Sequence, residues 1–369
     1  MKLEDLGEQV LRDYKTVKYF PFFNSAGSPF ILTSDSLGYL EAWIDRKYNS
    51  IKRDKARMKK KLEKARYFTQ LSKDFYNSAS HASMPSKGTL IYYSFINLVK
   101  VFLILKGGLD LETKTEHHGL SLPSDFKLKL KLASNSGDGV SIFHEFSKHI
   151  GKEVKNTEGA EIRFFDLLRN LPEVHEIGYA LNLFPDTKRK FLPVDVYIRT
   201  NSYRNRIYYT ISHEKKFDKE MKVEKLTKGI CQKKIYPLEI EDDQKFHHYR
   251  SHFEVSYTKG SSKSWNICYP KIIKDINELN IAPMLTRQGY RYYLDLEPYR
   301  LHRLSSILGF AYYLGTVARY RPTLNEEILK GQYQSIINEA VISCPNQFFY
   351  LMVSHITSQV CAIPMANIS

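Results

Sequence analysis

The hydrophobic period of this chain changes twice along its length, and this change constrains the fold more than any other feature. Within residues 191–270, β-branched and aromatic residues alternate with polar ones in runs such as VDVYIRT and RIYYTIS, and clusters of Asn, Ser and Gly separate the runs. Such runs are typical of antiparallel strands. On both sides, apolar residues recur every three or four positions, which indicates helices. We therefore expect an α+β fold, mostly helical, with helical flanks around a central antiparallel β-rich segment.

The expected domain organisation follows from the same change of period. The chain has 369 residues, of which 43% are hydrophobic, so it can bury a large core. We predict three regions: an N-terminal helical region with a basic helix at 1–185, a β-rich middle segment at 186–275, and a C-terminal helical region at 276–369 that packs back on the N-terminal one.

Local patterns predict several individual elements. A strand is expected at 126–132, where FKLKLKL alternates apolar residues with Lys. Short helices are expected within 140–150 and 162–170. Two prolines, Pro322 and Pro345, interrupt the helical pattern near the C-terminus. The helices expected there span about 299–318, 324–341 and 347–359.

The most apolar stretch of the chain is LIYYSFINLVKVFLIL at residues 90–105. It is shorter than a bilayer crossing requires, and Asn97 and Lys100 interrupt it, so we expect a buried helix and no membrane association. Gly107 and Gly108 follow directly and supply a helix stop. The four cysteines are far apart, and the N-terminus has no apolar leader, which favours a reduced, cytoplasmic setting.

Basic residues are concentrated within residues 46–66, where eleven Lys or Arg and two acids give nine of the fifteen excess positive charges. The apolar spacing predicts one helix with a single apolar stripe, formed by Ile51, Met58, Leu62, Ala65 and Phe68. A block this basic favours a polyanionic partner, because binding to phosphates releases counterions. The cations that we assign here to nucleic-acid contact are Arg46, Lys52, Arg53, Arg57, Lys60 and Lys64. A solvated face or a docking surface for an acidic protein would show the same pattern.

Arginine and tyrosine are interleaved in three further segments, at 199–209 (RTNSYRNRIYY), 286–293 (TRQGYRYY) and 318–322 (ARYRP). Arg binds phosphate and a Tyr ring stacks on a base, and single-stranded nucleic acid is bound by this combination. From these segments we assign Arg204, Arg206, Arg319 and Arg321 to nucleic-acid contact. The alternative is that these Tyr–Arg pairs stabilise sheet surfaces and helix ends.

Four motifs carry a resemblance to a known family. They are, in this order, KARYFTQ, YYSFINLVKVFLILKG, EHHGL and YYLGTVARYRP. They resemble the YaaC-like family over the two helical flanks, about half of the chain. The helical parts of that family are similar to the HEPN superfamily, whose members include ribonucleases of toxins and antiphage systems. The resemblance therefore implies RNA as the partner and a bacterial antiphage-defence or stress module as the setting.

The similarity to the HEPN superfamily also implies a catalytic set. Its nucleases use an Arg, the polar residue after it and a His four to six positions after the Arg, and Arg169, Asn170 and His175 match this spacing. A neutral imidazole would accept the proton of a ribose 2′-hydroxyl, and the guanidinium would hold the charge on the phosphate. Pro172 departs from the pattern, because it ends or restarts a helix. The alternative is a core stripe that ends at Pro172, formed by Leu167, Leu168, Leu171 and Val174, with Arg169 and His175 as solvated neighbours.

Two other groups of histidines are candidates for chemistry. His247, His248 and His252 lie close in sequence, but the surrounding pattern is that of a strand, so we expect no metal site. His117 and His118 follow the Gly-capped helix, where a loop histidine can reach a groove or bond to a backbone carbonyl. No Gly-rich phosphate loop is present, and we expect no cofactor.

The hypothesis that accounts for the charge, the Arg–Tyr segments and the resemblance is a nucleic-acid-binding protein, with RNA favoured over DNA. The sequence leaves open whether it is also a metal-independent endoribonuclease. Its other expected partners are a protein of the same defence module and, in a homo-oligomer, further copies of itself. The alternative is a non-catalytic assembly or scaffold subunit that binds a partner protein. The salt dependence of binding distinguishes the nucleic-acid-binding protein from the scaffold subunit, because contacts to phosphates weaken steeply as the salt concentration rises.

Overall fold

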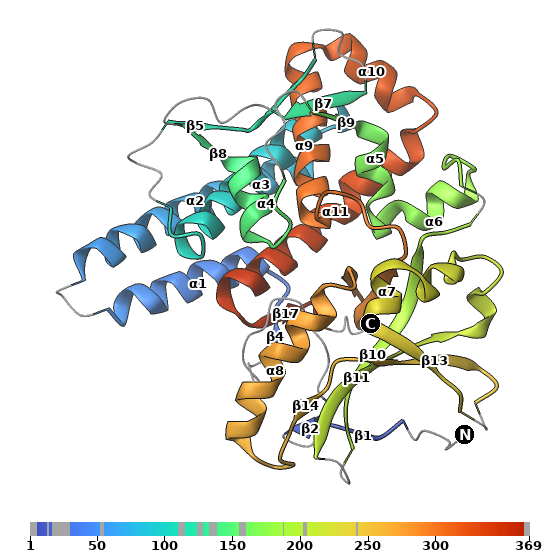
Figure 1. Ribbon diagram of the computed structural model, residues 1–369. Helices are drawn as coiled ribbons and strands as arrows, with labels where there is room; N and C mark the ends of the chain where they lie inside the picture. The colour runs from blue at the N-terminus through green and yellow to red at the C-terminus, as the bar shows by residue number, and fades with distance from the viewer. Residues whose placement is uncertain are drawn as a thin grey trace, which may run out of the picture. The chain divides into compact units, whose positions relative to one another are not determined.

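The computed structural model of the protein shows two compact units. The sheet unit comprises Met1–Leu32, Asp186–Pro298 and Ser358–Ser369, and the helical unit comprises Thr33–Pro185 and Tyr299–Thr357. The expected α+β, mostly helical fold with a central antiparallel sheet is confirmed (Figure 1). The structure describes residues 6–12, 15–16, 30–51, 55–109, 115–123, 128–132, 139–154, 160–186, 188–201, 205–240 and 243–364.

Helices make up most of the helical unit (Figure 1). They are α1 (Ser36–Asn49), α2 (Ala56–His81), α3 (Met84–Leu105), α4 (Ile142–His149), α5 (Phe164–Arg169), α6 (Pro172–Ala180), α9 (Arg303–Tyr320), α10 (Pro322–Lys330) and α11 (Gln334–Thr357). Short strands lie among them: β5 (Glu116–His117), β6 (Leu120–Ser121), β7 (Lys129–Leu132), β8 (Val140–Ser141) and β9 (Glu161–Arg163). β5 pairs with β8 in parallel, and β6, β7 and β9 form an antiparallel sheet in that order.

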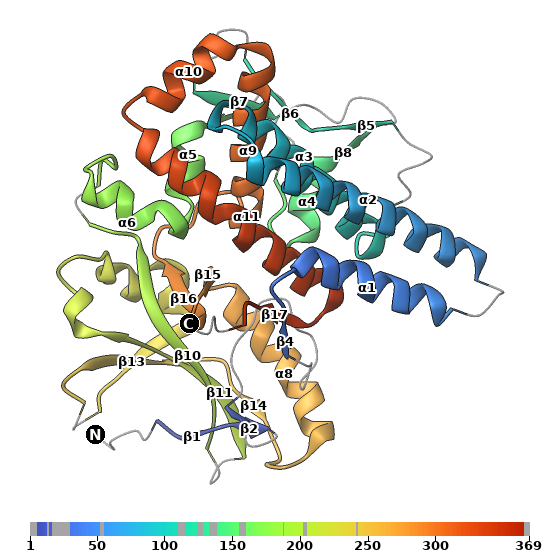
Figure 2. The ribbon, with the colours of Figure 1, turned by 180° about the vertical axis from the view of Figure 1, so that it is seen from behind.

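The apolar helix α3 lies at the centre of the helical unit, between other helices (Figure 2). A Cβ atom added at Gly315 of α9 would lie 3.2 Å from Cα of Thr89 in α3, so the small residue permits the two helices to approach closely. On α11, Phe348 stacks on Phe95 of α3 with 4.2 Å between the ring centroids. Among the described residues, α3 alone is long and apolar enough to cross a membrane, and 72% of its most apolar window is buried inside the protein. The buried helix expected at 90–105 is therefore confirmed.

The prolines near the C-terminus act differently from one another. The interruption expected at Pro322 is present, and α10 begins at this residue, because a first helical residue needs no hydrogen bond from its nitrogen. The helix expected over about 324–341 is wrong in its extent, since α10 ends at Lys330 and α11 begins at Gln334. The break expected at Pro345 is wrong, since α11 continues through it. Pro345 is buried together with most of this helix, and the packing of both halves offsets the lost backbone hydrogen bond.

The single basic helix expected around residues 46–66 is also wrong. The segment is divided between the last turn of α1 and the first turns of α2, and the Ser50 amide closes α1 by donating to backbone carbonyls of its last turn. Like charges three or four residues apart destabilise a helix, which favours an interruption at this point. Leu62 and Ala65 are buried as predicted, whereas Met58 is 48% exposed.

Several short elements agree with their sequence patterns. The strand expected at 126–132 is present as β7, where Leu130 is buried and the flanking Lys129 and Lys131 are partly exposed. Phe126 and Lys127 lie outside the described residues. The helices expected within 140–150 and 162–170 are α4 and α5.

The sheet unit is built on an antiparallel sheet in the order β12-β13-β11-β10-β16-β15, with β1 on β10 and β14 on β11. The strands are β1 (Glu8–Gln9), β10 (Phe191–Asn201), β11 (Arg206–Glu214), β12 (Ile235–Leu238), β13 (Phe246–Ser251), β14 (Val255–Ser256), β15 (Ile281–Thr286) and β16 (Gly289–Asp295). Two further pairs are β2 (Leu11–Arg12) with β3 (Lys15–Thr16), and β4 (Phe30–Leu32) with β17 (Val360–Ala362). The helical pieces are η1 (Lys215–Phe217), η2 (Val223–Thr227), α7 (Gly229–Lys234) and α8 (Ser262–Asn277).

One face of this sheet is covered by α8. The Tyr209 hydroxyl of β11 donates a hydrogen bond of 2.8 Å to Asp275 of α8, and Trp265 of the same helix is fully buried. The register pairs Asp195 of β10 with Ser212 of β11. Because side chains alternate along strands, both leave the sheet on the face opposite to Tyr209. We call this second face the open face, and Asp195 on it is exposed.

The sheet unit extends further along the chain than the sequence indicates. β15 and β16 lie within 281–295, in the range that we assigned to the C-terminal helical region, and the unit ends at Pro298 before it resumes at Ser358. A tight turn joins the two strands, and Gly289 at its end has a φ of +95°. Glycine adopts this left-handed conformation without strain, so TRQGYRYY encodes a hairpin.

Candidate functional site

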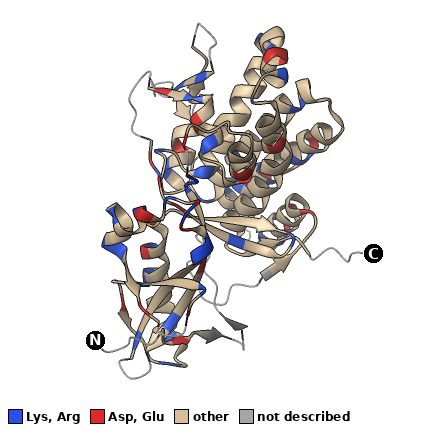
Figure 3. Ribbon diagram, turned by 90° about the vertical axis from the view of Figure 1, so that its right-hand side faces the viewer, with Lys and Arg blue, Asp and Glu red and all other residues tan. Residues whose placement is uncertain are grey.

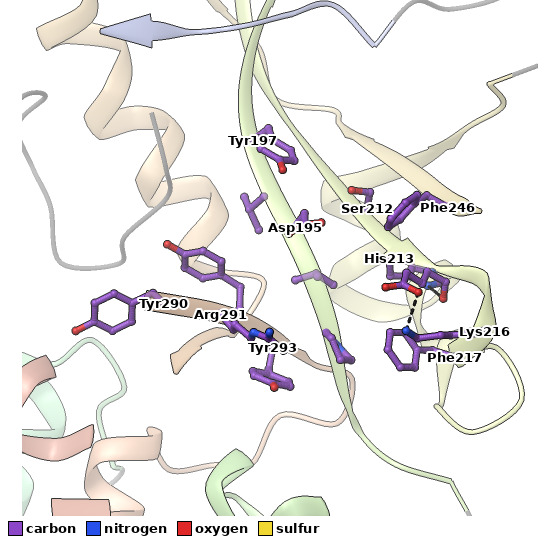
Figure 4. Close-up of a pocket in the computed structure, with 15 residues that line it drawn as sticks. Asp195, Tyr197, Ser212, His213, Lys216, Phe217, Phe246, Tyr290, Arg291 and Tyr293 are labelled. Atoms are coloured by element: carbon purple, nitrogen blue, oxygen red, sulfur yellow. Dashed lines mark hydrogen bonds and ion pairs between the residues drawn. The ribbon is translucent and has the colours of Figure 1, made fainter. Parts of the chain in front are cut away.

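A pocket of about 440 Å³ lies on the sheet, and six of its fifteen lining residues are Tyr or Phe. Figure 4 shows Tyr197, Phe246 and Tyr293 around it, with Asp195 and Ser212 between them. These five residues lie on β10, β11, β13 and β16, and the register places them on the open face. Alternation along the strands brings these five residues to one surface, and residues between them, such as Val194, His213 and Tyr292, complete the lining of the pocket.

Two of the three Arg–Tyr segments meet on this surface. Segment 286–293 lines the pocket with Tyr290, Arg291, Tyr292 and Tyr293. Segment 199–209 continues from the pocket, since Arg199 lies two residues along β10 from Tyr197 and therefore on the same face. β10 pairs with β16, so residues about a hundred positions apart in sequence become neighbours.

Guanidinium groups on the open face are held against tyrosine rings. The Arg199 guanidinium lies 5.4 Å from the Tyr197 ring centroid, and its Nε donates to Thr210 Oγ1 at 2.8 Å. Arg250 lies 3.9 Å from the centroid of the Tyr208 ring and donates to a Glu254 carboxylate oxygen at 3.0 Å. These contacts fix the planes of both guanidinium groups. Only Arg199 is partly exposed and can meet a ligand, because Arg250 and the Tyr208 ring are buried.

The pocket carries charges of both signs. Lys216 pairs with Glu214 at 2.7 Å. Burial lowers the pKa of His213, which is 2% exposed, so its imidazole is neutral at pH 7. Burial and the nearby Asp195 carboxylate raise the pKa of the Tyr197 hydroxyl, which stays protonated. The pocket can therefore bind a planar ring between aromatic side chains and bond to polar groups at the edge of the ring.

A second cluster lies in the helical unit, where Tyr92 of α3, Tyr312 of α9 and His118 after β5 pack together. Their ring centroids are 5.2 Å apart for Tyr92 and Tyr312, 5.5 Å for Tyr92 and His118, and 5.7 Å for His118 and Tyr312. The Tyr92 hydroxyl shares a hydrogen bond with Nδ1 of His118, and the Tyr312 hydroxyl donates to the Leu120 carbonyl at 2.7 Å. The two tyrosines are buried, whereas His118 is exposed. We call Tyr92, His118, Tyr312 and Arg319 the motif cluster.

Arg319 is the cation of the motif cluster. Its Nη1 donates to the Tyr93 hydroxyl at 2.5 Å and its Nε to the Gly315 carbonyl at 3.0 Å. The guanidinium lies 5.2 Å from the centroids of both the Tyr93 and the Tyr320 ring. Desolvation of the His118 ring lowers the pKa of that histidine, and the nearby charge of Arg319 lowers it further. The imidazole is therefore neutral beside a fixed positive charge at pH 7.

Comparison with known proteins bears on this cluster. The family model described as YaaC-like Protein matches residues 32–356. The chain belongs to the YaaC-like family. No curated protein and no solved structure matched it.

Three of the four sequence motifs that resemble the YaaC-like family meet at the motif cluster. YYSFINLVKVFLILKG contributes Tyr92, EHHGL contributes His118, and YYLGTVARYRP contributes Tyr312 and Arg319. Sequence analysis singled out His118 and Arg319 separately and did not connect them. The signal that could have connected them was the set of motifs itself, because segments that mark a family often share one site.

The catalytic set that the sequence suggested for this YaaC-like protein lies at the α5–α6 junction. Arg169 ends α5, Asn170 caps it, and Pro172 begins α6. The Asn170 amide donates to the Leu301 carbonyl at 3.2 Å and to Ser306 Oγ at 2.8 Å. His175, 2% exposed, packs on Tyr179 and Phe184 with centroid distances of 4.8 and 6.3 Å. The core stripe is confirmed, since all of its residues are fully buried: Leu167, Leu168, Leu171 and Val174. The expectation that His175 is a solvated neighbour of this stripe is wrong, because His175 is buried as well. A catalytic role for Arg169, Asn170 and His175 stays a prediction.

The cations assigned to nucleic-acid contact divide between the two units. Lys52, Arg53 and Arg204 lie outside the described residues. Arg206 belongs to β11 of the sheet unit and lies 3.8 Å from Glu254. Arg319 and Arg321 lie at the end of α9. In the helical unit, the end of α1 carries Arg46, and the beginning of α2 carries Arg57, Lys60 and Lys64.

The ends of α1 and α2 lie together. Arg66 pairs with Asp45 at 3.3 Å, and Lys59 lies 5.4 Å from the centroid of the Tyr48 ring. Burial and the charge of Lys47 lower the pKa of Lys106 at the end of α3, which indicates how closely the cations gather. We call the described cations of this place the basic turn: Arg46, Lys47, Lys55, Arg57, Lys59, Lys60, Lys61, Lys64 and Arg66. Figure 3 shows other Lys and Arg on helices and strands of both units, so the basic turn holds only part of the positive charge.

The remaining histidines form local pairs. His247 Nε2 lies 2.8 Å from Asp218 Oδ2, and His248 Nε2 lies 2.7 Å from Asp243 Oδ2. In the parts of the chain that the structure describes, no group of three or more His, Cys, Asp or Glu is placed to hold a metal ion. Near the motif cluster, Ser141 Oγ lies 2.5 Å from Nδ1 of His144 and caps α4, which is a structural role.

Proposed function

We propose that this protein binds single-stranded nucleic acid, with RNA favoured over DNA, through the open face of the sheet unit. The observation that supports it best is the combination on that face: a partly exposed Arg199 fixed against the Tyr197 ring, beside a pocket lined with Tyr197, Phe246 and Tyr293. Bases of any sequence stack on such rings, and fixed guanidinium groups bind the phosphates between them.

The pocket suits one unstacked nucleotide. Its volume of about 440 Å³ lies in the range of small-ligand sites. Asp195 and Ser212 face each other across β10 and β11, so a carboxylate and a hydroxyl are available to a polar ligand edge. A ribose 2′-hydroxyl can donate a hydrogen bond to the Asp195 carboxylate and accept one from the Ser212 hydroxyl, which favours RNA.

The basic turn supports the same function by a different force. Its cations repel one another, and a phosphate backbone relieves this repulsion by replacing condensed counterions. Such a field also accelerates the encounter with a strand. The setting that we propose, a bacterial antiphage-defence or stress module, rests on the resemblance of the helical parts to the HEPN superfamily.

Substitution of a pocket tyrosine tests the proposal. Tyr197→Leu keeps apolar bulk and removes the aromatic face, and we expect it to weaken binding of a short single-stranded RNA by about 5- to 150-fold, the loss of about 1–3 kcal/mol for one stacked base. Tyr197→Phe, which keeps the ring, is the matched control and should bind as the wild type does. Fluorescence anisotropy with labelled RNA measures both, and circular dichroism checks that the variants fold.

Two outcomes would contradict this function. Equal affinity of the wild type and Tyr197→Leu would remove the pocket from the binding surface. Affinity for a duplex that equals the affinity for a single strand would exclude stacking, because paired bases offer no open faces. The alternative function, a scaffold subunit for a partner protein, predicts no measurable affinity for either.

A further inference from the structure

The pocket on the open face carries charged groups beside its aromatic rings. Four of its described lining residues are charged, and two of them, Lys216 and Glu214, pair with one another at 2.7 Å. The other two, Asp195 and Arg291, are exposed. Figure 4 shows Asp195 between Tyr197 and Arg291. A ring that stacks in the pocket therefore meets a carboxylate and a guanidinium at its edge.

The sheet register brings these two side chains together. β10 and β16 are antiparallel neighbours, and Pro193 lies opposite Tyr293. Asp195 follows Pro193 by two residues, and Arg291 precedes Tyr293 by two residues, so alternation turns both charged side chains to the open face. Arg291 is oriented there, because its Nη2 donates to Gln288 Oε1 at 2.7 Å. An acceptor and an oriented donor thus lie on adjacent strands of one pocket.

Guanine is the base whose edge matches this pair of charged groups. Stacking is tolerant of sequence, so selectivity has to come from hydrogen bonds to the edge of the base. The Watson–Crick edge of guanine presents two adjacent donors, N1–H and the N2 amino group, and then the O6 acceptor. A carboxylate accepts from two adjacent donors at once, and arginine donates to O6. Adenine, cytosine and uracil each lack a pair of adjacent donors on this edge.

We propose that the pocket selects guanine in single-stranded RNA, with Asp195 as the residue that determines the specificity and Arg291 as the donor to O6. This inference rests on the proposed function, since it names the base that the strand-binding site prefers. An ionised carboxylate offers about four acceptor positions, so Asp195 can bind N1–H and the N2 amino group and still accept from a 2′-hydroxyl. Contacts to phosphates add affinity for every strand and no preference among bases.

The first part of the test varies one base of the ligand. Labelled uridine strands of about eight nucleotides carry a single central guanosine, inosine or adenosine, so their length and charge are equal. We expect the wild type to bind the guanosine strand about 5- to 150-fold more tightly than the adenosine strand, the discrimination of one bidentate contact. Both bases are purines and stack alike. Inosine lacks only the N2 amino group, so its strand should lose part of this preference.

The second part varies the protein, with fluorescence anisotropy as the measurement and circular dichroism as the check of folding. Asp195→Asn should bind the guanosine and inosine strands within about twofold of one another, because an amide presents a donor to one of the two groups. Arg291→Gln should weaken binding of both strands by about tenfold or more, because both bases carry O6. Glu278→Gln is the matched control, since it removes a negative charge at the end of α8, on the covered side of the sheet, and should keep the full preference.

Two results would overturn the inference: equal affinity of the wild type for the guanosine and adenosine strands, or an Asp195→Asn variant that keeps the wild-type preference for guanosine over inosine. Either result, with the strands still bound, would disprove the selection of guanine and leave the proposed function intact. A wild type that binds none of the strands would instead disprove the proposed function itself, so the two failures are distinguishable.

Discussion

A guanidinium that hydrogen bonds already hold loses little freedom when it meets a phosphate, and the Tyr93 hydroxyl and the Gly315 carbonyl hold Arg319 in this way. In the sheet unit, Thr210 Oγ1 and the Gly7 carbonyl hold the guanidinium of Arg199 in a similar way. At the scale of single residues, hydrogen bonds thus fix guanidinium groups in orientations that suit a phosphate. The interleaving of Arg and Tyr in sequence predicts the contacts of Arg319 with Tyr320 and of Arg199 with Tyr197. It gives no sign of the contact of Arg319 with Tyr93, which lies on another helix.

The histidine beside Arg319 gives a prediction at the same scale. Arg319→Gln removes a positive charge that disfavours the imidazolium, so the pKa of His118 should rise toward the ordinary value of about 6.5. Lys100 and His117 remain and continue to lower it. Titration of the imidazole protons by NMR measures the change, and Arg163→Gln is the control. An unchanged pKa of His118 in Arg319→Gln would show that the two side chains do not interact.

Sequence analysis could not assemble the motif cluster from its residues. Tyr92, His118 and Tyr312 come from α3, from the loop after β5 and from α9, and hydrophobic periodicity informs only on neighbours within a few turns. Where the partners are close in sequence, prediction succeeds: the stripe from Leu167 to Val174 is buried as expected. Contacts between residues that are close in sequence could therefore be predicted, whereas contacts between distant segments of the chain could not.

At the scale of helices and strands, one buried ion pair joins three elements of the helical unit. Arg303 of α9 donates from Nε to Glu173 of α6 at 3.0 Å, and its Nη2 donates to Gln347 of α11 at 3.2 Å. The side chains of the pair are 7% and 0% exposed. Sequence patterns did not predict the pair, because a charged residue in an apolar stripe gives no sign of its partner.

Removal of one partner should destabilise this junction strongly. Glu173→Gln leaves the Arg303 charge buried without a carboxylate, and we expect the free energy of unfolding to fall by about 3–5 kcal/mol. Urea unfolding followed by circular dichroism measures it. Glu326→Gln is the matched control, since it breaks the exposed pair with Lys330 on α10 and should leave the unfolding curve unchanged. Equal effects of the two substitutions would mean that burial of the Glu173 pair is unimportant.

The elements also show where local patterns fail. α11 passes through Pro345 although proline disfavours a helix interior, because packing along a whole helix outweighs the loss at one residue. Within residues 46–66 the opposite holds, since the periodic stripe predicts one helix and the chain forms two helix ends instead. The number of cations within 46–66 can be counted in the sequence. The residue at which α1 ends could not be predicted from that number.

At the scale of the whole molecule, the excess of fifteen positive charges raises one question: whether the basic turn binds phosphates or only adds to a general attraction. The salt dependence of RNA binding separates the two. Neutralising Arg57, Lys60 and Lys64 together to Gln should reduce the slope of log affinity against log salt by about 2, or about 0.7 for each phosphate that the variant no longer neutralises. Anisotropy titrations across a range of salt concentrations measure this slope.

A triple variant on α8 is the matched control for the basic turn, because it removes the same amount of positive charge from another surface. Lys263, Lys271 and Lys274 are exposed on this helix, which covers the face of the sheet opposite to the pocket, so their neutralisation to Gln should leave the slope unchanged. Equal reduction of the slope in both triple variants would mean that only the total charge attracts RNA. A slope near zero for the wild type would mean that RNA binding involves no contacts to phosphates. A partner protein would then be the better candidate for the ligand of the basic turn.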